Sequence, residues 1–372
     1  MKKVLFITSA DLMKTYNSGG EHECWNNIHF LKEIYGEQNV SFLFFSEWKG
    51  EFPKQYYVFP RLRRWKALFA QLLGYKMYFP WNEKRILKSI LMISPDIIFF
   101  DGVLVGNLLS KISKDIYTIV FEHNCEKKYY TLRMKHEGLI YAIEYWSVSR
   151  CEKIAVSECS MLICINERDR LNIFKIYSRE ADLLLPVSFE NKLCKNKIKK
   201  NNSKEIVFIG SNFGPNLQGI AWFVENVMSC LPDFKLYIVG KDFEKDKEYL
   251  ERRNVIVVGT VDNIEDIYYH YSIVVMPIFY GSGMKVKTAE AMMYGRTILA
   301  TDEALEGYDI EGVNGIFRCN TQEEYINVII QLFKDDIPEF REEVHQKYLE
   351  KYSNGAALDT LRKALPTGEK YE

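Results

Sequence analysis

The stretch that decides the fold is residues 280–307, which read YGSGMKVKTAEAMMYGRTILATDEALEG. Just before it, the apolar run 273–276 predicts a buried strand. Glycines then free the backbone, and apolar residues from Val286 onward recur at three- and four-residue spacing, which predicts a helix. Residues 297–300 read as the next strand. The stretch therefore predicts a strand, a glycine loop, a helix and a second strand in succession.

A glycine loop that leads into a helix favours an anionic ligand, because free N–H groups and the helix dipole attract negative charge there. Lys285 and Lys287 add positive charge, so a diphosphate suits this loop. Glu290 lies about one turn further into the helix, where its carboxylate is placed to accept hydrogen bonds from ribose hydroxyls. The same residues also fit an ordinary strand, turn and helix of an α/β domain, with the lysines in water.

Length and composition limit the class of protein. A chain of 372 residues predicts two domains. A net charge of -1 argues against a general nucleic-acid-binding protein. The eight cysteines include no Cys-x-x-Cys and read as reduced thiols. We find no signal peptide and no run near the ~20 apolar residues of a spanning helix, so we expect a cytoplasmic protein.

Short apolar runs that alternate with helical patterns predict two parallel sheets. Strands are expected at 3–9, 40–45, 97–100, 117–121, 161–165 and 183–185, and again at 205–209, 235–239, 255–258, 273–276, 297–300 and 315–318. A long helix is expected at 139–157. Residues 191–204 are rich in Lys and Asn and read as a linker. We therefore expect domains at 1–190 and 205–338, followed by a helical tail at 339–372.

Two segments of the first half stand apart from this alternation. Gly19 and Gly20 lie in an unusually long polar loop after the first strand. Residues 61–78, RLRRWKALFAQLLGYKMY, alternate cations with large apolar side chains. This pattern suits an anionic membrane surface, with Trp65, Leu68, Phe69 and Leu72 inserting while Arg61, Arg63, Arg64 and Lys66 meet headgroups. It equally fits a helix packed on the first domain with a solvated basic face.

The strand at 117–121 delivers the sequence Glu122-His123-Asn124-Cys125-Glu126 at its carboxyl end. Ligands bind at this edge of open α/β sheets. A histidine at this position is suited to contact a sugar or to transfer a proton, and the same residue equally fits a capping or structural histidine, the more usual role of a lone histidine.

The stretch 280–307 resembles the donor-site segment of GT-B fold glycosyltransferases, especially the family-4 (group 1) bacterial sugar transferases. Their segment runs Gly-x-Gly-x-x-x-Lys-x-x-Glu-Ala-Met-x-x-Gly and ends Glu-Gly. The matching positions are Gly281, Gly283, Lys287, Glu290, Ala291, Met292, Gly295, Glu306 and Gly307. Two departures stand out. Many members carry a Glu where this chain has Ser282, and an Arg and a Lys in the loop after Gly210, where this chain has neither.

The resemblance implies an α/β protein of GT-B fold, with two Rossmann-like doubly wound domains facing each other across a cleft and a tail that crosses back to the first domain. It implies transfer of a sugar from a UDP- or GDP-linked donor to a hydroxyl acceptor, with retention, and without a metal or other cofactor; the chain contains no Asp-x-Asp. A lipid-linked saccharide of bacterial surface polysaccharide synthesis is the expected acceptor, reached from the inner face of the plasma membrane. The alternatives are a non-catalytic donor-binding partner subunit and a sugar-nucleotide epimerase.

The resemblance also implies the site residues. Related enzymes carry His-Asn-x-Glu with the histidine facing the donor sugar, so His123 is expected to be catalytic with Lys287 and Glu290. The expected donor-binding residues are Gly210, Ser211, Asn212, Asn216, Lys241, Val261, Gly281, Ser282, Gly283, Met284, Lys285, Lys287 and Glu290. The expected acceptor-side residues are Gly19, Gly20, Asn124 and Glu126.

Overall fold

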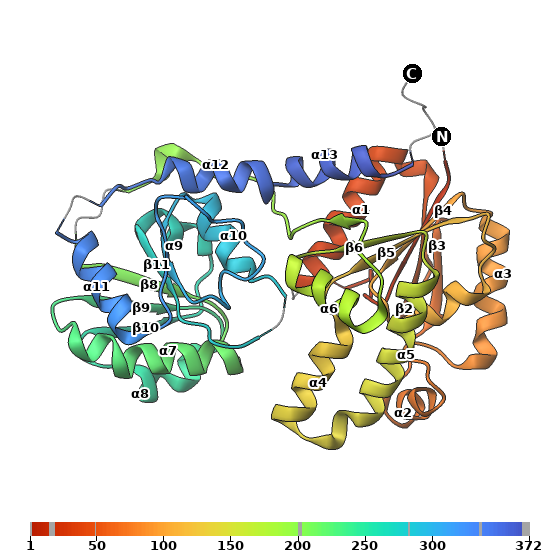
Figure 1. The fold of residues 1–372 in the computed structure, drawn as a ribbon, viewed down its shortest axis with the longest axis horizontal. Coiled ribbons are helices and arrows are strands. Elements are labelled where there is room, and N and C mark those ends of the chain that lie inside the picture. Colours follow the sequence, from red (N-terminus) through yellow and green to blue (C-terminus); the bar gives the residue numbers. More distant parts are fainter. Residues whose placement is uncertain are drawn as a thin grey trace. The chain divides into compact units, whose positions relative to one another are not determined.

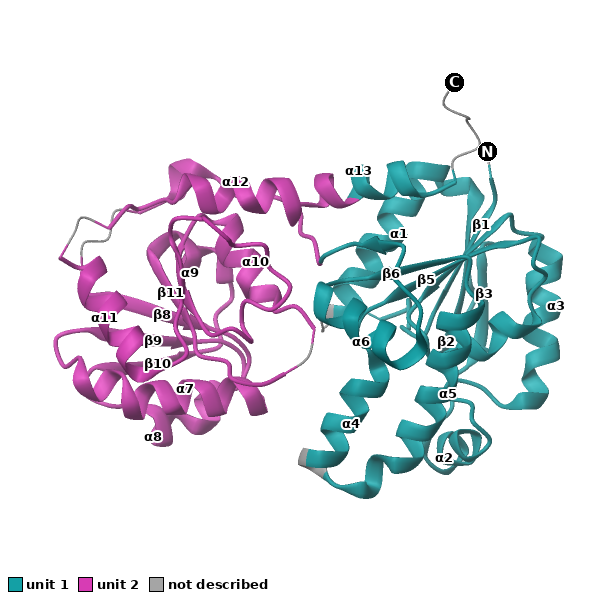
Figure 2. Ribbon diagram, viewed as in Figure 1, with its two compact units in different colours: residues 1–186, 358–372 teal, residues 187–357 magenta. Residues whose placement is uncertain are grey.

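The computed structural model describes residues 2–14, 19–48, 50–199, 203–281, 283–334 and 337–366. Its internal contacts divide the chain into two compact units (Figure 2). Unit 1 comprises Met1–Pro186 and Leu358–Glu372, and unit 2 comprises Val187–Ala357. Each unit is built around a parallel sheet with helices on its faces (Figure 1).

Within the described residues, unit 1 contains a seven-stranded sheet in the order β3-β2-β1-β4-β5-β6-β7. Its strands are β1 (Val4–Thr8), β2 (Val40–Ser46), β3 (Tyr56–Pro60), β4 (Ile97–Asp101), β5 (Tyr117–Glu122), β6 (Met161–Cys164) and β7 (Leu183–Leu184). All neighbouring strands are parallel. The strand order reverses between β1 and β4, and the carboxyl ends beside such a reversal form the ligand-binding crevice of doubly wound folds.

The helices of unit 1 are α1 (Gly19–Tyr35), α2 (Arg64–Leu72), α3 (Glu83–Ile93), α4 (Glu126–Glu137), α5 (Ala142–Glu158) and α6 (Glu167–Tyr177). Sequence patterns did not predict β3, α3 or α4. The segment 61–78 is helical only over α2, and the helix expected at 139–157 begins at Ala142, after a short 3-10 turn at Leu139–Tyr141. The carboxyl-terminal helix α13 (Asn354–Ala364) begins in unit 2, and its residues from Leu358 belong to unit 1.

The strands of unit 1 are almost continuously apolar because the sheet is covered on both faces. Val4, Leu5, Phe6 and Ile7 of β1 are all fully buried, so side chains that point to opposite faces are equally shielded. Phe6 stacks on Phe99 of β4, with ring centroids 5.5 Å apart. Burial on both faces is what made these strands recognisable in the sequence.

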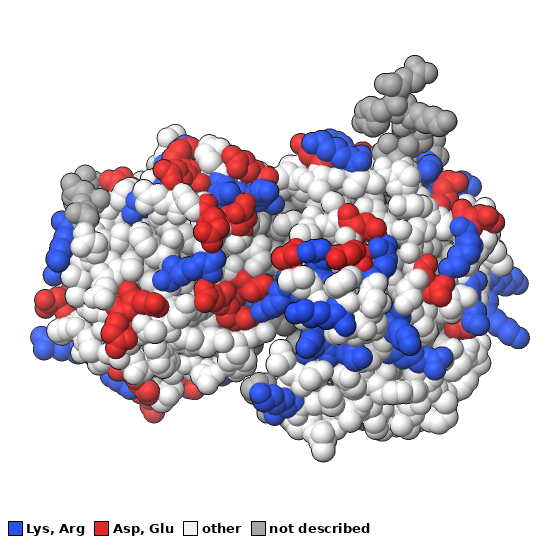
Figure 3. Space-filling view, in the orientation of Figure 1, with Lys and Arg blue, Asp and Glu red and all other residues white. Residues whose placement is uncertain are grey.

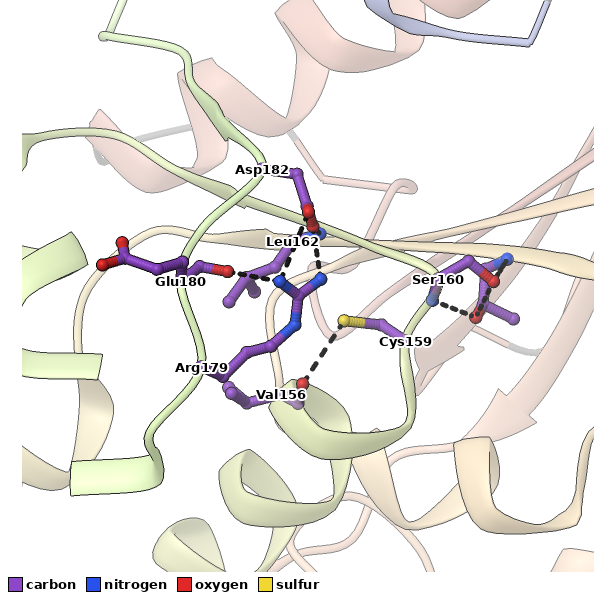
Figure 4. Close-up of polar contacts among 8 residues, drawn as sticks. Val156, Cys159, Ser160, Leu162, Arg179, Glu180 and Asp182 are labelled. Atoms are coloured by element: carbon purple, nitrogen blue, oxygen red, sulfur yellow. Dashed lines mark hydrogen bonds and ion pairs between the residues drawn. The ribbon is translucent and has the colours of Figure 1, made fainter. Parts of the chain in front are cut away.

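Polar contacts fix the amino-terminal edge of this sheet (Figure 4). The Leu162 amide donates to Asp182 Oδ2 over 2.7 Å, and Arg179 pairs with the same carboxylate. Ser160 and Thr118 exchange backbone-to-side-chain hydrogen bonds of 3.1 and 3.2 Å. These contacts hold the starts of β5 and β6 in register, at the edge opposite the one that carries His123.

Unit 2 contains, within the described residues, a six-stranded parallel sheet in the order β10-β9-β8-β11-β12-β13. Its strands are β8 (Glu205–Ile209), β9 (Lys235–Val239), β10 (Val255–Gly259), β11 (Ile273–Met276), β12 (Thr297–Ala300) and β13 (Ile316–Arg318). Its helices are α7 (Gly214–Asn226), α8 (Lys247–Leu250), α9 (Ile264–His270), α10 (Val286–Met293), α11 (Gln322–Leu332) and α12 (Glu342–Lys351). The order reverses between β8 and β11, which places the crevice of this unit at their carboxyl ends.

The segment that the sequence marks as a linker begins as part of unit 2. The Cys194 amide donates to the Tyr269 hydroxyl over 2.9 Å, and that hydroxyl donates to the Lys192 carbonyl over 3.1 Å. Residues 200–202 lie outside the described part of the chain. At the other end, Arg362 of α13 pairs with Glu33 of α1 at 2.6 Å within unit 1.

Candidate active site

The glycine loop of unit 2 connects β11 to α10, so the predicted strand, helix and second strand are confirmed. Gly283 has a φ of +63°, a left-handed conformation that glycine adopts at little cost. Met284, the next residue, is buried against the domain. Ser282 lies outside the described residues. The loop thus turns sharply into the amino terminus of α10, where backbone N–H groups are unsatisfied by the helix itself.

Lys287 of α10 is joined to the loop after β8 through Asn216 of α7. Its Nζ donates to Asn216 Oδ1 over 2.8 Å, and Asn216 Nδ2 donates to the Ser211 carbonyl over 2.7 Å. A Cβ on Gly210 would lie 2.9 Å from both Asn216 Nδ2 and Lys287 Nζ, so a larger residue there would displace them. Gly210, Asn216 and Lys287 therefore form one cluster at the carboxyl ends of β8 and β11.

Lys287 is half-buried. Desolvation lowers the pKa of its amine to about 8, with the nearby charge of Lys285 acting in the same direction and Glu290 opposing both. Its Nζ also lies 5.6 Å from the centroid of the Phe208 ring. The amine is therefore still mainly protonated at pH 7. A diphosphate bound beside it would restore the full charge, because a nearby anion favours the protonated amine.

Lys285 is already paired with an anion of the protein. Its Nζ donates to the Gly283 carbonyl over 2.9 Å and to Glu303 Oε1 over 2.7 Å. The two side chains are only 13% and 16% exposed. Sequence reasoning assigned Lys285 to the donor phosphates but missed Glu303; the signal was the polar sequence Thr301-Asp302-Glu303 directly after β12. A phosphate at the loop would have to compete with Glu303 for this amine.

Glu290 lies one helical turn beyond Lys287 and accepts a hydrogen bond of 3.2 Å from the Tyr268 hydroxyl at Oε2. Tyr268 is buried and stacks on Tyr294, with centroids 4.9 Å apart. Burial raises the pKa of Glu290, while the Tyr268 hydrogen bond and the charge of Lys287 lower it. Tyr268, which the sequence did not reveal as a site residue, therefore orients the carboxylate that we expect to accept from ribose hydroxyls.

The remaining predicted donor residues line the neighbouring strand ends. The Asn212 amide donates to the Lys241 carbonyl over 2.8 Å, which ties the loop after β8 to the loop after β9. Ser211 and Lys241 are exposed, and Val261 is half-buried just after β10. The structure thus joins Asn212 to Lys241 through the backbone, whereas Val261 takes part in none of the contacts described above.

In unit 1, residues that close three adjacent strands meet at one carboxylate. His123 follows β5, and its Nε2 lies 3.1 Å from Oδ1 of Asp101, the last residue of β4. Thr8, the last residue of β1, donates to Asp101 Oδ2 over 3.0 Å, and Asn27 of α1 donates to Oδ1 over 3.2 Å. Sequence reasoning identified His123 but missed the other three. The available signal was that a polar residue ends each of these strands.

Asp101 is buried, and burial alone would raise its pKa, but the His123 ring and the hydrogen bonds it accepts outweigh this effect and lower the pKa below its ordinary value. The pKa of His123, whose side chain is 20% exposed, shifts in the opposite direction. Burial lowers its pKa, but Asp101, Glu23 and Glu126 outweigh burial, so the pKa of His123 is raised. Asp101 is therefore ionised, and His123 Nε2–H is the donor of their hydrogen bond.

The predicted acceptor-side residues lie in unit 1. Gly19 and Gly20 begin α1, and a Cβ on Gly20 would meet nothing within 4 Å. Asn124 is half-buried beside His123. Glu126 is the first residue of α4, and burial, with the charge of Glu152 adding to it, raises the pKa of Glu126 to about 7. This carboxyl group is therefore poised to change its protonation near neutral pH.

Residues 203–335 match the family model for glycosyl transferases group 1. A Klebsiella pneumoniae protein described as an uncharacterized 44.6 kDa protein in cps region is 23% identical over 337 residues, covering 82% of this chain and 84% of that protein.

Two solved structures show the same fold over almost the whole chain. Anabaena Alr3699/HepE in complex with UDP has a TM-score of 0.68 at 15% identity and covers 97% of this chain and 99% of that chain. WaaG, described as a glycosyltransferase involved in lipopolysaccharide biosynthesis, has a TM-score of 0.64 at 14% identity, with 97% and 99% covered. The two doubly wound sheets therefore define the GT-B fold. Because the segment around the donor-side cluster also matches group 1, the protein is a glycosyltransferase of GT-B fold with a group 1 transferase segment in unit 2.

Proposed function

We propose that this glycosyltransferase moves a sugar from a UDP- or GDP-linked donor to a hydroxyl group of a saccharide acceptor. The observation that carries the proposal is the cluster of Gly210, Asn216 and Lys287 beside the amino terminus of α10. It offers a close backbone approach, a cationic amine and free N–H groups for a diphosphate. Glu290 lies one turn further along the same helix for the ribose. The UDP bound by HepE supports this class of ligand.

In the proposed reaction, the bond between the anomeric carbon and the diphosphate breaks while the acceptor oxygen bonds to that carbon and gives up its proton to an oxygen of the leaving diphosphate. The negative charge that develops on the leaving diphosphate is stabilised by the dipole of α10 and by Lys287. Lys285 contributes once it exchanges Glu303 for a phosphate oxygen. His123 orients the donor sugar. We propose retention and independence of metals and cofactors, since protein groups supply the charge and the chain lacks Asp-x-Asp.

We propose that the acceptor is a lipid-linked saccharide of bacterial surface polysaccharide synthesis. The described role of WaaG in lipopolysaccharide biosynthesis supports this class of acceptor, and the cps-region description of the Klebsiella pneumoniae relative is consistent with it. None of the described helices has both the length and the apolar character needed to cross a bilayer. A cytoplasmic enzyme would then have to reach the lipid by binding the inner face of the membrane.

The surface around α2 supports such binding. Trp65 and Leu72 are 69% and 53% exposed, and Leu68 and Phe69 on the same helix are exposed as well. Residues 52–95 contain nine Lys and Arg and a single carboxylate, Glu83, in a chain of net charge -1. Large apolar side chains framed by cations are suited to anionic headgroups. On the face that Figure 3 shows, the lower end of unit 1 is mainly blue and white.

A second group of exposed apolar side chains lies on the turn that joins α4 to α5. Leu139 and Ile140 are 81% and 82% exposed, more than any large apolar side chain of α2. Helices α2 and α4 both pack on α5, and all three lie at the same end of unit 1 (Figure 1). We therefore include this turn, with α2, in the proposed membrane contact.

The test is a panel of UDP- and GDP-sugars, assayed for binding by calorimetry and for transfer to lipid-linked and soluble saccharide acceptors. We expect binding and transfer with at least one donor. Binding without transfer to any acceptor would favour a donor-binding partner subunit. Conversion of the donor into its epimer without any acceptor would favour an epimerase. Transfer to soluble acceptors alone would overturn the lipid-linked acceptor.

A further inference from the structure

We propose that Asp101 is a positioning residue for His123: its buried carboxylate fixes the ring through Nε2 and keeps it cationic, so that Nδ1–H is the donor offered to the substrate. This inference rests on the proposed role of His123 toward the donor sugar.

The geometry leaves Asp101 little freedom. Its carboxylate accepts from Thr8 Oγ1, Asn27 Nδ2 and His123 Nε2 over 3.0, 3.2 and 3.1 Å. Thr8 and Asp101 are paired in register on neighbouring strands, so the backbone of the sheet sets their separation. A buried carboxylate held by three donors is both oriented and ionised, because each hydrogen bond favours the charged form.

The ring of His123 is oriented by the same contact. The rings of His123 and Phe121 pack in a T-shaped arrangement, with centroids 4.9 Å apart. Gly102 lies on another side; a Cβ there would be 3.7 Å from His123 Cδ2. With Nε2 tied to Asp101, Nδ1 has no hydrogen-bond partner among the residues that the structure describes. Nδ1 is therefore the ring atom left for a ligand.

The surroundings favour the cation. The charged groups that act on the ring are Asp101 from β4, Glu23 from α1 and Glu126 from α4, and all three are acidic. Glu126 itself has a pKa near 7, so it gains negative charge as the pH rises through neutrality and then favours the cation further. A cationic ring cannot act as a general base. It serves instead as a fixed hydrogen-bond donor of positive charge.

The direct test is nitrogen NMR of wild-type protein labelled with 15N-histidine, with the His123 signals assigned from a His123→Gln sample. We expect both ring nitrogens of His123 to carry protons at pH 7 and to lose one only at higher pH. A ring that is neutral at pH 7, or that titrates at or below the ordinary histidine value of about 6.5, would overturn the inference. This measurement needs no substrate, so it stands even if the proposed transfer reaction fails.

The second test compares Asp101→Asn with Asp96→Asn, which alters the exposed Asp at the start of β4 that binds the Lys3 amide. Asp101→Asn should lower kcat by about 10²-fold, move the alkaline limb of the pH profile to lower pH, and leave nucleotide affinity unchanged. Asp96→Asn should change none of these. A loss of kcat with an unmoved alkaline limb would show that Asp101 is merely structural.

Discussion

Lys287 and Glu290 illustrate how burial tunes single residues for ligand binding. Both lie on α10 one turn apart, and burial disfavours the charged form of each, lowering the pKa of the amine and raising that of the carboxyl. Their mutual attraction partly offsets this effect. A bound diphosphate would therefore stabilise the charged amine of Lys287, and ribose hydroxyls would stabilise the charged carboxylate of Glu290.

The first prediction concerns Glu290. Glu290→Ala should weaken UDP binding by about 1.5 to 3 kcal/mol, because the ribose hydroxyls lose a charged acceptor. Calorimetry measures this loss, and the exposed Glu323→Ala on α11 is the matched control. An affinity equal to that of the control would remove Glu290 from the donor site.

The second prediction concerns the charge of Lys287. Because the pKa of this amine is lowered to about 8, its positive charge is present below pH 8 and is lost as the pH rises through that value. Nucleotide affinity should therefore fall between pH 7 and 9, and Lys287→Met should bind weakly with little dependence on pH in this range. Equal pH dependence in the wild type and the variant would assign the titration to another group.

At the scale of elements, α4 and α5 enclose carboxyl groups whose pKa is raised by burial. Glu122 at the end of β5 is fully buried; burial and the charge of Glu152 on α5 raise its pKa well above the ordinary value. A raised carboxyl pKa means that the folded state holds the proton more tightly than the unfolded state does. Stability is then greatest below the unfolded pKa and is lost as the pH rises toward the folded pKa.

Glu122→Gln removes this dependence, because the amide cannot ionise. We expect the variant to melt at a higher temperature than the wild type at pH 8, with a smaller difference at pH 5. Glu158→Gln, at the half-buried end of α5, removes only a surface ion pair with Lys114 and should stay within about 0.5 kcal/mol of the wild type at both values. Scanning calorimetry at the two pH values checks this, and a variant less stable at pH 8 would contradict it.

The membrane contact is tested at the same scale. The wild type should bind anionic vesicles at low salt and release them as salt increases, since each cation near the surface adds about 1 kcal/mol. Changing Arg61, Arg63, Arg64 and Lys66 to Ser should abolish binding, and changing Leu139 and Ile140 to Ser should weaken it. The control changes Leu91 and Met92 to Ser, which are exposed on α3. A wild type that ignores anionic vesicles, or a control that loses binding equally, would remove the membrane proposal.

Sequence patterns predicted the elements that are apolar throughout and missed those that are not. The strands of unit 2 were expected almost to the residue, and the clearest of them, β11 and β12, are buried on both faces. Helix α4 was missed because its sequence, beginning Glu-Lys-Lys-Tyr-Tyr, has no apolar periodicity, and packing on α5 stabilises it instead. Strand β3 ends at Pro60, which weakens a strand prediction.

The same reasoning applies to the candidate site. Residues within one stretch, such as Lys287 and Glu290, were predictable from their spacing on one helix. Asp101 was missed because its meeting with Thr8 and His123 depends on the register of three strands far apart in the sequence. Glu303 was missed for a similar reason, since its contact with Lys285 joins the end of β12 to the start of α10.

At the scale of the whole molecule, the two units repeat one architecture with different chemistry at the strand ends. In unit 2 the reversal between β8 and β11 gathers an amine, an amide and a glycine suited to a diphosphate. In unit 1 the reversal between β1 and β4 gathers Asp101 and His123. Changes in unit 2 should therefore affect nucleotide affinity, whereas changes at His123 should affect turnover.

That division gives one more prediction. His123→Ala should leave nucleotide affinity nearly unchanged while removing turnover, because the ring acts on the sugar and not on the nucleotide. The melting temperature should fall only modestly, because the buried Asp101 loses its charged partner but keeps the hydrogen bonds from Thr8 and Asn27. Calorimetry with UDP, a thermal melt and a turnover assay measure the three quantities. A large fall in melting temperature with a proportional loss of activity would show that His123 is structural.

The central claim is that the chain transfers a sugar from a nucleotide-sugar donor, and a transfer assay tests it most directly. The purified protein is incubated with each UDP- and GDP-sugar and with bacterial lipid extract, and the labelled lipid-linked product is measured alongside release of the nucleotide. We predict that one donor labels the lipid and releases its nucleotide in equal amounts, and that Glu290→Ala and His123→Ala both abolish labelling. Nucleotide sugars that bind tightly but label no acceptor would contradict the claim.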